Sequence, residues 1–153
     1  MSLTFSFASI RDVLSKLERD STRMRTEEMN GDRFFDFVVT AYSMIDWVKR
    51  DPSVPASAKQ PHEIQWLYSN QWIKVCGDLA TAVKHFALTT RHPTTSATTS
   101  ETGFGVGRFG MGGYGDGEES IELTLNDGTK LNALDVVQGA ISAWKTFFQA
   151  HSV

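Results

Sequence analysis

The chain has 153 residues, of which 41% are hydrophobic and 22% charged, with a formal net charge of −3 at pH 7. This composition predicts one soluble globular domain over residues 1–153 and excludes a disordered or fibrous protein. The negative charge argues against a general affinity for nucleic acid. Because no apolar run could span a membrane and no signal peptide is recognisable, we expect a cytoplasmic protein without a membrane partner.

Two N-terminal helices are predicted from hydrophobic periodicity, at about residues 9–25 and 32–49. Ser9 with Asp12 resembles a capping box for the first helix, and Asp32 can cap the second. The second helix is apolar on nearly every side, as expected at the centre of a bundle. Basic residues of the first helix alternate with acidic ones, which favours a solvated face with local ion pairs over a stripe that binds RNA.

Asp46 is the exception in the otherwise apolar second helix. Burying its carboxylate without a partner would cost several kcal/mol. We therefore expect Asp46 to pair with a cation, supplied by Lys84, His85 or an arginine of the first helix. A structural pair is favoured over a catalytic one.

A proline-containing connection follows at 51–61, and two further helices are predicted at about 61–68 and 70–88. The second of these has apolar side chains at steps of three and four, which predicts one buried face. That face includes Cys76, whose thiol is expected to pack in the core. With a single cysteine in the chain, no metal site and no cofactor are expected.

The same helix carries a cluster of polar residues, Asp78, Lys84 and His85. Asp78 stands seven residues before His85 on one side of the helix, about 10 Å away along its axis, so the two cannot bond directly. The favoured interpretation is a polar edge beside the core, with His85 bonded to a neighbouring helix. The alternative is a catalytic or ligand-binding histidine, with Lys84 attracting an anion such as phosphate.

A long loop is predicted at 89–118, rich first in threonine and serine and then in glycine. Its aromatic and basic side chains either bind a partner surface or RNA bases, or fold back onto the core. A match to the pattern GxGxxG within the loop is attributed to chance, because neither a strand before it nor a helix after it is predicted. The candidate binding residues of the loop are Phe104, Arg108, Phe109 and Tyr114.

A β-hairpin is predicted at 120–132, where alternating apolar residues surround the turn sequence Asn126-Asp127-Gly128. Asn132 then caps a last amphipathic helix at about 133–150. The expected fold is mainly α: a bundle of four to five helices with a C-terminal β-hairpin and a long Gly-rich loop.

Three short segments, 46–48, 76–80 and 84–86, give the chain the pattern DWV … CxDLAxxxKHF. With this pattern, followed by a hairpin and a last helix, the chain resembles a family of uncharacterised bacterial and phage proteins. The resemblance covers about residues 34–148 and implies no activity. More distantly, the chain resembles the HEPN superfamily of helical proteins, many of which are ribonucleases of toxin–antitoxin and anti-phage systems.

In the HEPN motif an arginine is followed by four to six residues and then a histidine. In this chain Asp78, not an arginine, stands at that distance before His85. What the HEPN resemblance implies is a metal-independent ribonuclease, with His85 as general acid or base.

Two functions follow as expectations. The first is a non-catalytic module that binds a protein partner or forms a homodimer, since the chain shows no complete catalytic set. The alternative is the HEPN-like ribonuclease of a toxin or anti-phage system, in which Lys84 stabilises the phosphate of an RNA substrate. Its candidate catalytic residues are His85, Lys84, Asp78 and Asp46.

Overall fold

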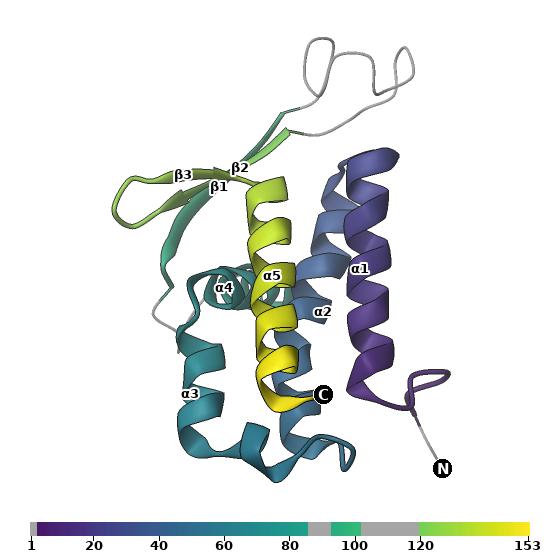
Figure 1. The fold of residues 1–153 in the computed structure, drawn as a ribbon. Helices are drawn as coiled ribbons and strands as arrows, with labels where there is room; N and C mark the ends of the chain where they lie inside the picture. The colour runs from purple at the N-terminus through teal and green to yellow at the C-terminus, as the bar shows by residue number, and fades with distance from the viewer. Residues whose placement is uncertain (1–2, 86–92, 102–119) are drawn as a thin grey trace.

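The computed structural model describes residues 3–85, 93–101 and 120–153, the side chains of His85 and Glu101 excepted. Within these ranges the chain forms five α-helices and one three-stranded antiparallel sheet (Figure 1), which confirms the predicted mainly α fold. The helices are α1 (Ile10–Thr26), α2 (Gly31–Arg50), α3 (Pro61–Ser69), α4 (Gln71–His85) and α5 (Ala133–His151), with a 3₁₀ turn at Ala56–Lys59. The strands are β1 (Thr95–Glu101), β2 (Ser120–Leu125) and β3 (Lys130–Asn132).

Capping side chains explain where the first and last helices begin. The Asp12 carboxylate accepts from the backbone N–H of Ser9 at 2.8 Å, as the capping box predicts. At the start of α5, Asn132 and Asp135 bond each other's backbone N–H groups at 2.9 and 3.0 Å. Among the helices described, none combines the length and apolar character that a membrane span requires.

The start of α2 differs from the prediction that Asp32 caps it. The cap is Asn30, whose side-chain oxygen accepts from the backbone N–H of Arg33 at 2.9 Å. Asn30 is the last residue with extended backbone angles, and the helix begins directly after it at Gly31. Asp32 therefore lies inside the first turn, where its negative charge still favours the helix N-terminus.

The core lies between α1, α2, α4 and α5. Figure 1 shows α1, α2 and α5 running side by side, with α4 seen nearly end-on behind α5. Trp144 of α5 is fully buried, and its indole N–H donates to the backbone oxygen of Ala41 in α2 at 3.0 Å. This bond satisfies the one polar atom of a large apolar side chain, as buried tryptophans require. Other fully buried side chains are Ile10, Leu17, Phe37, Met44, Leu67, Ile73 and Leu123.

The sheet has the strand order β1-β2-β3, and both neighbouring pairs are antiparallel. Leu123 of β2 is fully buried and Ile121 nearly so, whereas the residues between them are more exposed. This alternation turns one face of β2 toward the helices, as the sequence pattern predicts. The turn between β2 and β3 places Gly128 at a φ of 88°, where a residue without a side chain is favoured.

Strand β1 was not predicted, because its sequence TSATTSE falls in the stretch 89–118 that we expected to be a loop. Its residues 96–100 are exposed, so the strand has no buried face to create apolar alternation. What defines it is pairing with β2, in which Thr98 lies opposite Leu123 and Ser100 opposite Ile121. Threonine favours strands, but that preference alone does not separate a strand from a polar loop.

Candidate binding site

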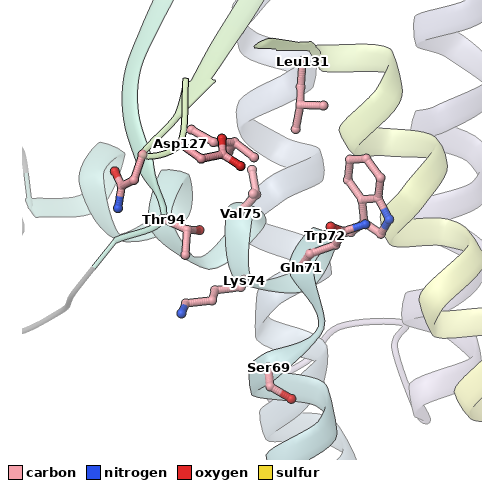
Figure 2. A pocket seen from close by; sticks show the side chains of 10 residues that line it. Ser69, Gln71, Trp72, Lys74, Val75, Thr94, Asp127 and Leu131 are labelled. Carbon is pink, nitrogen blue, oxygen red and sulfur yellow. The ribbon is translucent and has the colours of Figure 1, made fainter. Parts of the chain in front are cut away.

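A cavity of about 370 Å³ lies between α4 and the turn that joins β2 to β3. Its apolar walls come from both sides, and Figure 2 shows Leu131 of the hairpin pointing down toward Val75 of α4. Hydrogen-bonding side chains surround this apolar part. The lining consists of Trp72, Val75, Leu125 and Leu131, together with Ser69, Gln71, Lys74, Thr94, Asn126 and Asp127.

Trp72 forms the wall between this cavity and α5. Its indole lies against Gly139 of α5, where an added Cβ atom would be 2.2 Å from Cδ2 of the ring. No side chain other than hydrogen fits at that distance, so glycine allows the helix and the indole to approach. The position of Trp72, and with it one side of the cavity, depends on this contact (Figure 2).

The opposite wall is held by Asp78, one turn beyond Val75 on α4. Its carboxylate accepts from the backbone N–H of Thr94 at 2.8 Å and from the Thr94 hydroxyl at 3.0 Å. A third bond comes from the backbone N–H of Thr95 at 3.2 Å. Because Asp78 is only 2% exposed, these bonds replace the water that a buried carboxylate loses. They attach the start of β1 to α4.

The turn between β2 and β3 forms the remaining part of the rim of the cavity. The Asn126 side chain donates to the backbone oxygen of Pro93 at 2.8 Å, and its backbone N–H donates to Thr94 at 2.9 Å. Asp127 accepts from the backbone N–H of Thr129 at 2.8 Å. Bonds from the Thr129 hydroxyl and N–H lower the pKa of Asp127, so its carboxylate is charged at neutral pH. The rim therefore carries the negative charge of Asp127 and the positive charge of Lys74.

The structure places two of the predicted catalytic candidates, Asp78 and Lys84, in different environments. Asp78 is buried and bonded to the backbone of another element, whereas Lys84 is exposed. His85 is the last residue of α4, and its side chain lies outside the described part of the chain. These contacts attach Asp78 to β1 and the turn before it, whereas the bond expected from His85 to a neighbouring helix stays a prediction.

Contrary to expectation, Asp46 is not buried, and no described ion pair joins it to Lys84 or to an arginine of α1. Its side chain is 69% exposed, and its nearest cation is Lys49, one turn along α2, at 3.9 Å. Asp46 lines a second cavity, of about 430 Å³, with Trp47, Arg50 and residues of the N-terminal segment. Neither of these two cavities contains both Asp46 and Asp78, so the described structure does not join them in one site.

Cys76 packs in the core as predicted. Its thiol is fully buried, and burial together with the nearby Asp78 charge raises the pKa of Cys76 to about 12. Such a thiol is not a nucleophile at neutral pH. Within the described residues, no three histidine, cysteine, aspartate or glutamate side chains are grouped as metal binding would require.

The loop candidates Phe104, Arg108, Phe109 and Tyr114 lie outside the described residues, so their predicted role stays a prediction. Comparisons with protein-family models, curated proteins and solved structures gave no match to the chain. The resemblance to a bacterial and phage family, and to HEPN proteins, also stays a prediction.

Sequence reasoning missed the cavity, although it identified several of its parts. Trp72 and Val75 were expected on a buried helical face, and Asn126 and Asp127 were expected in a turn. Nothing local indicates that these two segments meet. The one available signal is Gly139, an isolated glycine inside a helical pattern, which often marks a close approach.

Proposed function

We propose that the protein is a non-catalytic module that binds a segment of a protein partner in the cavity between α4 and the β2–β3 turn. The supporting observation is the lining: apolar side chains from two elements surrounded by hydrogen-bonding groups of both charges. Pockets that bind ligands commonly combine apolar walls with a few polar groups that fix orientation. The cavity volume of about 370 Å³ suits one large apolar side chain and its backbone.

The polar rim suits a peptide because a peptide backbone presents both donors and acceptors. Gln71 offers an amide, Lys74 a donor and Asp127 an acceptor, and all three line the same opening. Lys74 is the one cation among the described lining residues, which favours a peptide over a phosphate group as the ligand. An apolar anchor in the cavity with backbone bonds at its rim is therefore the favoured mode of binding.

The lining also supports binding without catalysis. Among the described lining residues there is no histidine or cysteine, and their one serine, Ser69, donates its hydroxyl to the backbone oxygen of Trp66 at 3.2 Å. Nucleophilic catalysis needs a nucleophile beside a general base. Asp78, the buried carboxylate nearest to the cavity, is already bonded to Thr94 and Thr95.

A selection from a random peptide library tests the proposal. Purified protein should enrich peptides that share one large apolar residue flanked by polar ones. A variant with Leu131→Asp places a charge in the apolar part of the cavity and should lose these peptides. Selected peptides should bind the unmodified protein with a Kd in the micromolar range, on the order of 1–100 μM.

The matched control is Val83→Asp, which introduces the same charge on α4 at an exposed apolar residue outside the cavity lining. This control should keep the selected peptides. The proposal fails if Leu131→Asp enriches the same peptides as the unmodified protein while both variants remain folded by circular dichroism.

The ribonuclease alternative has a separate test. Total RNA is incubated with the unmodified protein and with His85→Ala. If the protein only binds a partner, the RNA stays intact in both samples. Cleavage that is lost in His85→Ala would instead establish a nuclease and overturn the proposed lack of catalysis.

A further inference from the structure

The outer side of α1 is a basic face made by Arg11, Arg19 and Arg23. All three are exposed, and their spacing of eight and four residues places them on one side of the helix. The flanks of α1 already have partners: Lys16 bonds Thr40 of α2, and Glu18 pairs with Lys145 of α5. None of the ion pairs between described residues uses the three arginines.

The outer side of α2 is an acidic face made by Asp32, Asp36 and Asp46, each of them exposed. Between these charges lie two apolar side chains, Phe35 at 44% and Val39 at 37% exposure. Phe35 and Val39 are four residues apart and therefore neighbours on the helix surface. The face thus combines negative charge with an uncovered apolar centre.

The two faces are level with each other along the helix pair. α1 and α2 run side by side in opposite directions (Figure 1), and the bond of 3.2 Å between Lys16 Nζ and Thr40 Oγ1 gives an approximate common level for the two helices. Counting outward from that bond, each arginine of α1 comes within one residue of the level of an aspartate of α2. The level pairs are Arg23 with Asp32, Arg19 with Asp36 and Arg11 with Asp46.

We propose that these two faces form the interface of a homodimer, in which α1 of each subunit packs against α2 of the other. The two-fold axis runs parallel to the helices, because rotation about such an axis leaves every residue at its own level. Arg19 then meets Asp36 of the partner subunit, and the reciprocal contact forms on the other side. A two-fold interface requires this self-complementarity.

The apolar centre fits the same arrangement. Arginine carries a long aliphatic stem and a planar cation that stacks on aromatic rings. Arg19 and Arg23 are therefore suitable side chains to cover Phe35 and Val39 of the partner subunit. An acidic face alone would repel its own copy, so only the pairing of unlike faces is favourable.

The level pairs do not satisfy each other within one subunit. No ion pair between described residues joins one of the three arginines to one of the three aspartates, and Asp46 has only a weak contact of 3.9 Å with Lys49 of its own helix. The axes of packed helices lie about 8–10 Å apart, and side chains on the outer faces point away from the contact. A second copy brings the unlike charges face to face.

This inference concerns a different surface from the cavity between α4 and the β2–β3 turn, and it does not depend on the proposed peptide binding. Because the interface is largely charged, the dimer should weaken as salt rises. We expect a dimer at low ionic strength and a shift of the dissociation constant by about tenfold or more between 50 and 500 mM salt.

A charge exchange tests the interface. Variant one carries Arg19→Glu with Arg23→Glu, and variant two carries Asp32→Lys with Asp36→Lys. Each alone places like charges opposite each other and should be monomeric by sedimentation at concentrations where the unmodified protein is dimeric. Mixed in equal amounts, the two variants should form a heterodimer, since one side regains unlike charges and the other side is unmodified.

The results of this exchange distinguish a change in dimer formation from a local change in the fold of one subunit. A monomeric unmodified protein at low salt, variants that dimerise normally, or a mixture that stays monomeric would each overturn the proposal. Circular dichroism confirms that the variants fold, and Arg19→Gln with Arg23→Gln is a milder pair if the reversal unfolds the chain. The cavity variant Leu131→Asp should remain dimeric, which distinguishes this result from a failure of the peptide-binding proposal.

Discussion

The indole of Trp72 lies on Gly139 so closely that a Cβ atom added there would be 2.2 Å from Cδ2 and 2.4 Å from Cε2. We therefore expect Gly139→Ala to destabilise the fold. Helix propensity alone would favour alanine by about 1 kcal/mol. Overpacking costs typically about 1–3 kcal/mol, and the obstacle here is a rigid ring. Because the ring cannot easily move, we expect the upper part of that range, and urea unfolding should show a net loss of up to about 2 kcal/mol.

The neighbouring substitution Gln138→Ala is the control, because Gln138 is exposed on the same helix and should change stability little. A double-mutant cycle with Trp72→Ala identifies the ring as the cause. In the Trp72→Ala background, Gly139→Ala should become neutral or stabilising. An equal loss in both backgrounds would show that the ring does not limit the site.

Asp78→Ala should loosen the start of β1, because it leaves the N–H groups of Thr94 and Thr95 and the Thr94 hydroxyl without their acceptor. Unsatisfied buried donors make a loss of about 2–4 kcal/mol the expected result of urea unfolding. Hydrogen exchange should accelerate at the Thr94 and Thr95 amides. Lys84→Ala, on the exposed side of the same helix, is the control.

Asp78→Asn gives a graded comparison. The amide oxygen still accepts a hydrogen bond, but the charge is lost, so stability should fall between that of the unmodified protein and that of Asp78→Ala. If Asp78→Ala were as stable as the unmodified protein, the carboxylate would not be holding β1, and a functional role would again be open.

Stability in acid should depend on Asp51, which joins the end of α2 to the start of α1. Its carboxylate accepts from the backbone N–H of Ile10 at 2.7 Å and from the Ser53 N–H and hydroxyl at 2.8 and 2.7 Å. Burial alone would raise the pKa of Asp51. The hydrogen bonds from Ser53 and Ile10, with the Lys59 charge, lower the pKa of Asp51 on balance below its ordinary value.

A lowered pKa in the folded state means that protonation opposes folding. The contribution of Asp51 is present in full above the unfolded pKa and is lost as the pH falls from about 4 through the lower folded value. Urea unfolding between about pH 6 and pH 3 should therefore show falling stability, with a smaller fall in Asp51→Asn. An equal fall in both proteins would assign the acid sensitivity to other carboxylates.

Cys76 should be unreactive while the chain is folded. Burial raises its pKa to about 12, so almost no thiolate exists at neutral pH, and the sulfur has no solvent access. A chromogenic disulfide reagent should label Cys76 only at the rate at which the protein opens, and quickly in denaturant. Rapid labelling without denaturant would contradict the buried position.

Local patterns were enough to locate the helices. The last helix was expected at about 133–150 and runs from Ala133 to His151, because its apolar spacing and its cap are both encoded within one segment. Local hydrophobic patterns did not predict the exposed environment of Asp46. The sequence FFDFVV suggested a helix buried on all sides, whereas packing leaves Phe35 and Val39 partly exposed.

Long-range contacts explain what could not be predicted. Strand β1 exists through its pairing with β2, and the cavity exists because the turn at Asn126 meets the helix that carries Val75. No periodicity connects such distant segments. The reason for a glycine at position 139 becomes clear only from the structure, in which the Trp72 ring lies against it.

The bond between Trp144 and Ala41 joins residues 103 positions apart. During translation α1 and α2 are synthesised well before α5. The apolar faces that α5 buries in the folded protein are therefore exposed at first. Leu17 and Phe37 belong to that early, unfinished surface. A chain in that state exposes apolar surface of the kind that chaperones hold. Slow translation before residue 133 would prolong that vulnerable interval.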